Sequence, residues 1–94
     1  MLALMIASAS PVMAQTTDAG RGEIPLTVPA SYDASVPTPL IVNLHGYTGG
    51  GEGHDRRWGI SALADQYGFL SIAPDGAREE SDDRNRFWNA SDAC

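Results

Sequence analysis

The residues most capable of chemistry form one glycine-rich stretch, residues 45–53, with the sequence HGYTGGGEG. Five of these nine residues are glycine, and the stretch directly follows an aliphatic run at residues 40–44. Where such a loop joins a buried strand to a helix, its backbone N–H groups commonly face a ligand. Two chemistries fit that arrangement: binding of a phosphate or dinucleotide, and stabilisation of an oxyanion during acyl transfer.

Nucleotide binding is the weaker interpretation of this loop. The spacing GxGxxG is missing, and no lysine follows the glycines as in a P-loop, since all six basic residues are arginine. The oxyanion interpretation needs only backbone donors aimed at the oxygen that becomes negative. In α/β-hydrolases one donor comes from the loop after the third strand, where HG-type motifs lie. The sequence LHGY at residues 44–47 occupies that context.

The segments on either side of the loop predict a strand–helix–strand unit. Residues 40–44 indicate a strand buried on both faces of a parallel sheet, and residues 69–73 a second strand, ended by the turn PDG at 74–76. The fold class is therefore α/β, with a parallel βαβ unit and a right-handed crossover.

A single amphipathic helix is expected between these strands. Apolar residues recur at helical spacing, Asp55 lies near the expected helix start, and Gly68 suits a left-handed C-terminal cap. The apolar stripe consists of Ile60, Leu63, Ala64 and Tyr67.

Residues 15–38 are interpreted as a lead-in to this domain. Residues 15–22 are small and polar and indicate a flexible segment. Residues 23–28 alternate weakly and predict a short strand, in which Pro25 favours an edge position because proline cannot donate to a ladder. A proline-rich loop follows up to residue 39.

Residues 1–14, MLALMIASASPVMA, are interpreted as a secretory signal truncated at its front. The run carries no charge and ends in a small-x-small pattern, but it is too short to span a bilayer. We therefore expect the protein to be exported to the periplasm or the extracellular space. The net charge of −6 and the absence of a basic cluster exclude nucleic acid and anionic membranes as partners.

From residue 39 the sequence resembles secreted polyhydroxybutyrate depolymerase-like and feruloyl esterase-like proteins of the α/β-hydrolase superfamily. The resemblance rests on PLIVNLHGYTGGGEGHDRRWGISALADQYGFLSIAPDG and on the later run RFWNASDAC. It implies a carboxylic-ester hydrolase acting on polyhydroxyalkanoate or hydroxycinnamoyl esters, without a cofactor. Residues 39–94 are then the start of an α/β-hydrolase domain.

The resemblance also implies roles for particular residues. Tyr47 would contribute its backbone N–H to the oxyanion hole, and Gly46 would let the substrate carbonyl approach closely. His45 would hold the loop through its side chain rather than act as the catalytic base. Substrate contacts are implied at the later run, for Arg86, Trp88 and Asn89.

A catalytic serine of this fold lies on a GxSxG elbow, and the sequence contains no such motif. We therefore expect the chain to be the amino-terminal part of a hydrolase, inactive alone, with Cys94 awaiting a disulfide partner in the absent part. A metal site built from His45, His54, Asp55 and Cys94 fails on ligand type and spacing. Two alternatives stay open: a secreted polymer- or carbohydrate-binding module, and a pseudogene remnant.

Overall fold

The computed structural model describes residues 13–90. The predicted export signal lies outside them except for its last two positions, and Cys94 lies outside them as well. In chain order the elements are β1 (Met13–Asp18), β2 (Glu23–Val28), β3 (Leu40–Val42), α1 (Gly51–Trp58), the 3-10 helix η1 (Ser61–Leu63), α2 (Ala64–Tyr67), β4 (Leu70–Ile72), β5 (Ala77–Arg78) and β6 (Arg86–Phe87).

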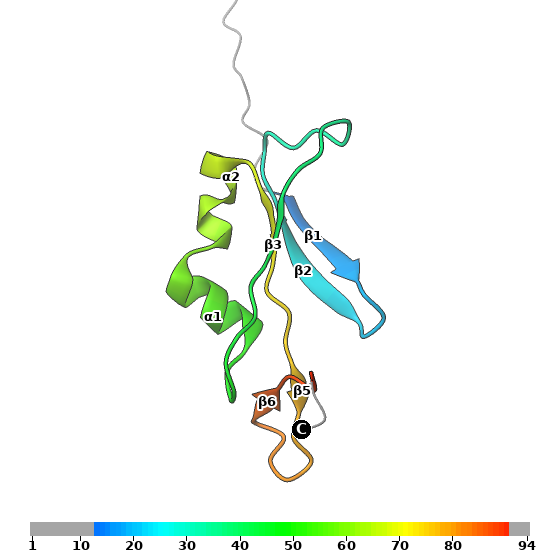
Figure 1. Ribbon diagram of the computed structural model, residues 1–94, viewed down its shortest axis with the longest axis vertical. Coiled ribbons are helices and arrows are strands. Elements are labelled where there is room, and N and C mark those ends of the chain that lie inside the picture. Colours follow the sequence, from blue (N-terminus) through cyan, green and yellow to red (C-terminus); the bar gives the residue numbers. More distant parts are fainter. Residues whose placement is uncertain (1–12, 91–94) are drawn as a thin grey trace, which may run out of the picture.

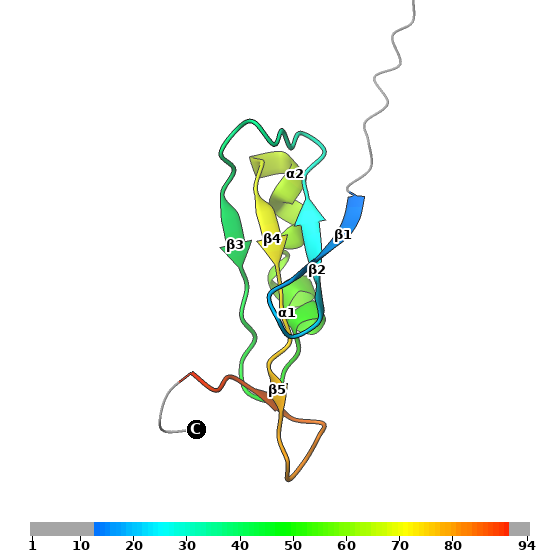
Figure 2. The ribbon, with the colours of Figure 1, turned by 90° about the vertical axis from the view of Figure 1, so that its right-hand side faces the viewer.

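The main sheet is mixed, with the strand order β1-β2-β4-β3 (Figure 1). β3 and β4 pair in parallel, Leu40 opposite Leu70, and the helices lie between them in the chain, which is the expected strand–helix–strand arrangement. β2 pairs antiparallel with both β1 and β4, so the expectation of a parallel sheet holds for one strand pair only. The helices lie on one face of this sheet, behind the strands in Figure 2.

Residues 15–18 of the segment expected to be flexible belong instead to strand β1, so the prediction was wrong for these residues. β1 forms a hairpin with β2, in which Asp18 pairs with Glu23. The turn between them contains Gly20 and Gly22, with φ of 100° and 101°, and both of their N–H groups donate to Asp18 Oδ1. An aspartate followed by glycines in the left-handed region is a turn signal that the sequence carried.

Strand β2 has the predicted bounds, but its predicted edge position was wrong. β2 lies between β1 and β4. Its first pair with β4 is Leu26 with Ile72, so Pro25 lies just before that ladder begins. The missing N–H of the proline therefore costs no bond between β2 and β4, and the strand can be internal.

Strand β3 is not buried on both faces as predicted, because it is the last strand of the sheet. Leu40 is 52% exposed and Val42 is 49% exposed. The neighbouring Leu44, just after the strand, is also exposed. Within residues 13–90 no strand pairs with the outer side of β3 and the helices cover one face only, so the aliphatic side chains remain open to solvent.

The predicted single helix is divided in two at Gly59, which has a left-handed conformation with φ 68° and ψ 25°. α1 begins before Asp55, which therefore lies inside the helix rather than at its start. The predicted cap at Gly68 is confirmed, with φ 68° and ψ 46°. The expected apolar stripe lies after Gly59, where a 3-10 turn precedes α2, and it does not form one buried face: Ala64 is fully buried, whereas Tyr67 is 67% exposed.

The buried core is small and lies where α2 and the preceding 3-10 turn pack on the sheet. Its buried apolar residues among those described are Val28, Ala64 and Phe69. The charged segment after the PDG turn forms a second hairpin, β5 with β6, which the sequence analysis did not predict. This hairpin lies beyond the carboxyl ends of β3 and β4, at the lower end of Figure 1.

Candidate functional site

The glycine loop, residues 45–50, begins where parallel strand β3 ends and leads into α1. The PDG turn at 74–76 begins at the same end of neighbouring strand β4, and the hairpin β5–β6 follows it. Crevices at the carboxyl ends of parallel strands are the usual ligand sites of open α/β sheets. The glycine loop thus meets the PDG turn and the hairpin that directly follows this turn, at the end of the sheet where such a site is expected.

His45 ties the glycine loop to the PDG turn. The side chain is 3% exposed. Its Nε2 accepts a hydrogen bond from the N–H of Gly76 at 2.9 Å, and its Nδ1 lies 2.6 Å from the carbonyl oxygen of Gly46. A ring nitrogen that accepts from an N–H carries no proton, so Nδ1 is the protonated nitrogen and donates to Gly46. With both nitrogens occupied, the ring positions the loop and is not placed to act as a base.

Trp88 covers this histidine. Its indole Nε1–H donates to the carbonyl oxygen of His45 at 2.7 Å, and the two ring centroids lie 4.9 Å apart. The residue expected to contact substrate is therefore also a support for the glycine loop. Burial of one aromatic ring against another, with the polar N–H satisfied, stabilises such a contact.

Arg86, also expected at the substrate, points to the PDG turn. Its guanidinium donates to the carbonyl oxygen of Gly76 at 3.3 Å and lies 3.5 Å from Asp75 Oδ2. Its own carbonyl oxygen accepts from the N–H of Thr48 at 2.9 Å. The third residue expected there, Asn89, is exposed. The structure brings Arg86 and Trp88 to the glycine loop and leaves Asn89 at the surface.

Asp75 is a site residue that the sequence analysis missed. Gly50, the N-cap of α1, has no side chain to accept from the first turn of the helix. Asp75 supplies that acceptor from another segment, because its Oδ1 accepts from the N–H of Gly51 at 2.8 Å. The sequence did hint at a capping role, since Asp75 lies in a turn directly after a strand. Its partner could not be predicted, because Gly51 lies 24 positions earlier in the chain.

The backbone N–H of Tyr47 points to no acceptor in the described part of the chain. The two following N–H groups are occupied: Thr48 donates to Arg86, and Gly49 donates to the carbonyl oxygen of Gly46 at 3.1 Å. A Cβ built on Gly46 would meet no atom within 4 Å, so the space beside the loop is open. The Tyr47 N–H is therefore one donor that an external acceptor could reach, whereas an oxyanion hole of the α/β-hydrolase type combines two such N–H groups.

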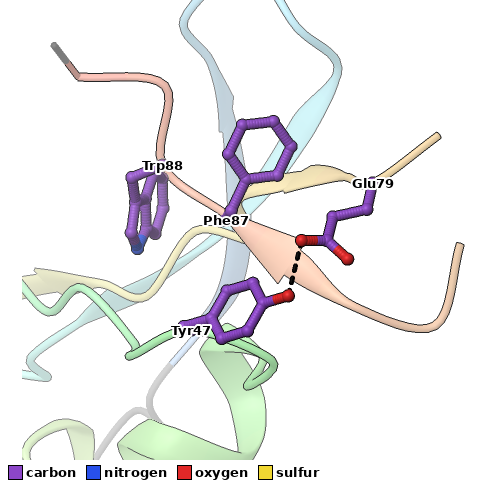
Figure 3. Close-up of a pocket in the computed structure, with 4 residues that line it drawn as sticks. All are labelled: Tyr47, Glu79, Phe87 and Trp88. Atoms are coloured by element: carbon purple, nitrogen blue, oxygen red, sulfur yellow. Dashed lines mark hydrogen bonds between the residues drawn. The ribbon is translucent and has the colours of Figure 1, made fainter. Parts of the chain in front are cut away.

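The side chain of Tyr47 lines an open pocket of about 460 Å³ together with Glu79, Phe87 and Trp88. Figure 3 shows Trp88 on one side and Glu79 on the other, with Phe87 and Tyr47 between them. The Tyr47 hydroxyl donates to Glu79 Oε1 at 2.5 Å. Glu79 and Phe87 were not among the predicted site residues, because the sequence analysis did not predict the hairpin that brings them to the glycine loop.

No serine among residues 13–90 is paired with a histidine. The Ser61 hydroxyl donates instead to Asp55, which also accepts from the Ser61 N–H at 3.0 Å. Ser71 lies in β4 and is 3% exposed. Residues 13–90 therefore contain the glycine loop and its supporting contacts, but no serine–histidine pair that could act as nucleophile and base.

Replacing His45 with alanine should lower the free energy of unfolding by about 2 kcal/mol, because the buried N–H of Gly76 loses its acceptor. The ring that Trp88 covers is lost as well. His45→Gln is the matched control, since its amide oxygen can approach the position of Nε2 and should recover most of the loss. Urea unfolding followed by circular dichroism measures both variants. Equal losses in the two variants would contradict this role of Nε2.

Replacing Glu79 with glutamine should lower the pKa of Tyr47 toward its ordinary value of 10.0. The hydrogen bond to the Glu79 carboxylate raises the Tyr47 pKa most, and desolvation and the negative charges of Glu79 and Asp82 raise it further, because each opposes formation of tyrosinate. The stabilisation from this contact is thus present at neutral pH and is lost as the pH rises through the Tyr47 pKa. Tyrosinate absorbance measures the shift in a Tyr32→Phe, Tyr67→Phe background. Glu80→Gln is the control and should leave the titration unchanged.

No family model matches this chain, and no curated protein shows significant similarity to it. Within residues 13–90, no helix has the length and apolar character needed to cross a bilayer. The same residues include no group of three or more His, Cys, Asp or Glu side chains placed to hold a metal ion. Functional inference therefore depends on the glycine loop and on the pocket beside it.

Proposed function

We propose that this chain supplies the oxyanion-hole loop of a secreted serine-type carboxylic-ester hydrolase. The observation that carries the proposal is the N–H of Tyr47, which has no acceptor among residues 13–90 and lies at the carboxyl end of a parallel strand. The support around it is rigid, because His45 and Trp88 hold the loop through hydrogen bonds at both ring systems. Preorganised donors of this kind stabilise an oxyanion without reorganising during the reaction.

In this proposal the loop acts on the ester carbonyl. A serine hydroxyl attacks the carbonyl carbon, the carbonyl oxygen becomes negative, and the Tyr47 N–H donates to it. Collapse of the intermediate releases the alcohol, and water then releases the acid from the acyl-enzyme. Gly46 leaves room for the carbonyl to approach, and His45 keeps the loop in place. The serine and its base must come from polypeptide outside these 94 residues, because the sequence has no GxSxG elbow.

A covalent serine probe tests the proposal directly. The full polypeptide that contains this sequence is treated with a p-nitrophenyl phosphonate, digested and analysed by mass spectrometry. We expect one labelled serine outside residues 1–94 and loss of p-nitrophenyl ester hydrolysis in step with labelling. The 94-residue chain alone should show neither labelling nor turnover. Absence of ester hydrolysis from the full polypeptide, or turnover by the short chain, would overturn the proposal.

Polyhydroxyalkanoate and hydroxycinnamoyl esters are the substrate classes we propose for this enzyme. The aromatic pocket next to Tyr47 favours a second candidate function, a secreted module that binds a polymer or a carbohydrate without catalysis. Aromatic side chains with one carboxylate form such surfaces in binding sites. The phosphonate experiment separates the two, because a binding module carries no serine that reacts.

A further inference from the structure

The aromatic pocket combines three rings with a carboxylate. Tyr47, Phe87 and Trp88 supply the rings, and Glu79 supplies the only charged group that lines the pocket within the described residues. A volume of about 460 Å³ is in the range of small-molecule sites. Aromatic faces attract cations through the ring quadrupole, and quaternary ammonium groups are recognised in this way.

The charge of Glu79 is not neutralised by a neighbouring cation in residues 13–90. Its two oxygens accept from neutral donors, the Tyr47 hydroxyl at 2.5 Å and Asn85 Nδ2 at 3.1 Å. These bonds hold the carboxylate in place at the pocket wall without cancelling its charge. The pocket therefore presents a fixed negative charge beside aromatic rings.

The three arginines of the surrounding hairpin are directed elsewhere. Arg78 donates to the carbonyl oxygen of Asp83 at 2.6 Å, and Arg84 forms an ion pair with Asp82 at 2.9 Å. Arg86 holds the PDG turn, as described above. The sequence has no lysine and a net charge of −6. Among the described residues, no positively charged side chain lines the pocket to repel an external cation.

We infer that this pocket binds a small organic cation of the quaternary ammonium class. In the inferred complex the ammonium head contacts the three rings, and the Glu79 carboxylate lies at one side of the same pocket (Figure 3). The inference is independent of the proposed ester hydrolysis, because it uses the side chain of Tyr47 and not its backbone N–H. A neutral ligand of the same shape fits the same pocket. It gains neither the cation–π attraction of the rings nor the electrostatic attraction of the Glu79 carboxylate.

Choline and its neutral isostere 3,3-dimethyl-1-butanol test this inference. Each compound is titrated into the full polypeptide that contains this sequence, and the methyl proton signals of the ligand are followed by NMR. Rings that surround the methyl groups should move the choline signal upfield in a saturable way. We expect choline to bind at least about tenfold more tightly than the neutral isostere. Equal affinities, or no saturable shift with choline, would overturn the inference.

Two substitutions separate charge from shape. Glu79→Gln keeps the size of the side chain and should weaken choline binding about tenfold, while binding of the neutral isostere stays within twofold. Phe87→Leu keeps an apolar wall but removes a ring, and should weaken choline binding several-fold without weakening the isostere. Trp58→Phe, in α1 and outside the pocket, is the control and should change neither affinity. Unchanged choline binding in folded Glu79→Gln protein would count against the inference.

Discussion

Replacement of Tyr47 by proline is expected to lower kcat for ester hydrolysis about 10²–10³-fold in the full polypeptide. Loss of one oxyanion donor has this effect in enzymes that stabilise a tetrahedral intermediate, and it corresponds to about 3 kcal/mol of transition-state stabilisation. Proline removes the N–H, and within residues 13–90 that N–H makes no hydrogen bond that folding would lose. Tyr47 is the second residue of a turn closed by the bond from the Gly49 N–H to the Gly46 carbonyl oxygen, and proline is favoured at this position of such turns.

The matched control is Tyr47→Phe, which keeps the backbone donor and loses only the hydroxyl bond to Glu79. We expect its kcat to fall at most a few-fold. Both variants are assayed with p-nitrophenyl butyrate, and their unfolding in urea is compared with that of the parent protein. If a folded Tyr47→Pro variant had the kcat of the parent protein, the Tyr47 N–H would not be an oxyanion donor.

Replacement of Gly51 by alanine should lower the free energy of unfolding by about 3 kcal/mol or more. A Cβ at this position would lie 1.9 Å from the carbonyl oxygen of Ala73 and 2.9 Å from that of Pro74. Both are backbone atoms of the segment after β4, so neither can rotate away as a side chain would. The first turn of α1 would have to retreat, and the bond from the Gly51 N–H to Asp75, 2.8 Å in length, would break.

Gly53→Ala is the control for this effect, because it makes the same chemical change in the same helix. A Cβ at Gly53 meets no atom within 4 Å. Alanine has the higher helix propensity, so this variant should be neutral or more stable by up to about 1 kcal/mol. Urea unfolding measures both variants. Equal stability of the Gly51→Ala and Gly53→Ala proteins would contradict the close packing of α1 against Ala73.

Local signals explain which parts of the fold could be predicted. β2 has its predicted bounds, β3 and β4 lie within their predicted segments, and Gly68 caps α2 as expected. These features depend on runs of aliphatic residues and on turn chemistry, which act over a few neighbouring positions. β1 could not be recognised in the same way, because its described side chains are polar and exposed and its conformation depends on pairing with β2.

In the candidate site, too, local features could be predicted from the sequence and contacts between distant residues could not. The position of the glycine loop was evident from residue types and their order, whereas the roles of Gly46 and Tyr47 were implied only by the family resemblance and stay predictions. The partners of these residues were not, because the Tyr47 hydroxyl meets a glutamate 32 positions away and the first turn of α1 is capped from 24 positions away. Arg86 and Trp88 were expected at a substrate, and their contacts with the loop and the PDG turn became visible only in three dimensions.

By itself, the sequence determined the parallel strand–helix–strand order and the place of the glycine loop within it. Three features could be seen only in the folded chain: β3 is an exposed outer strand, Gly59 divides the helix, and an aromatic pocket with one carboxylate lies beside the loop. The reason is physical. Strand and turn preferences act between neighbours in the chain, whereas strand order, burial and side-chain partners depend on contacts between distant segments.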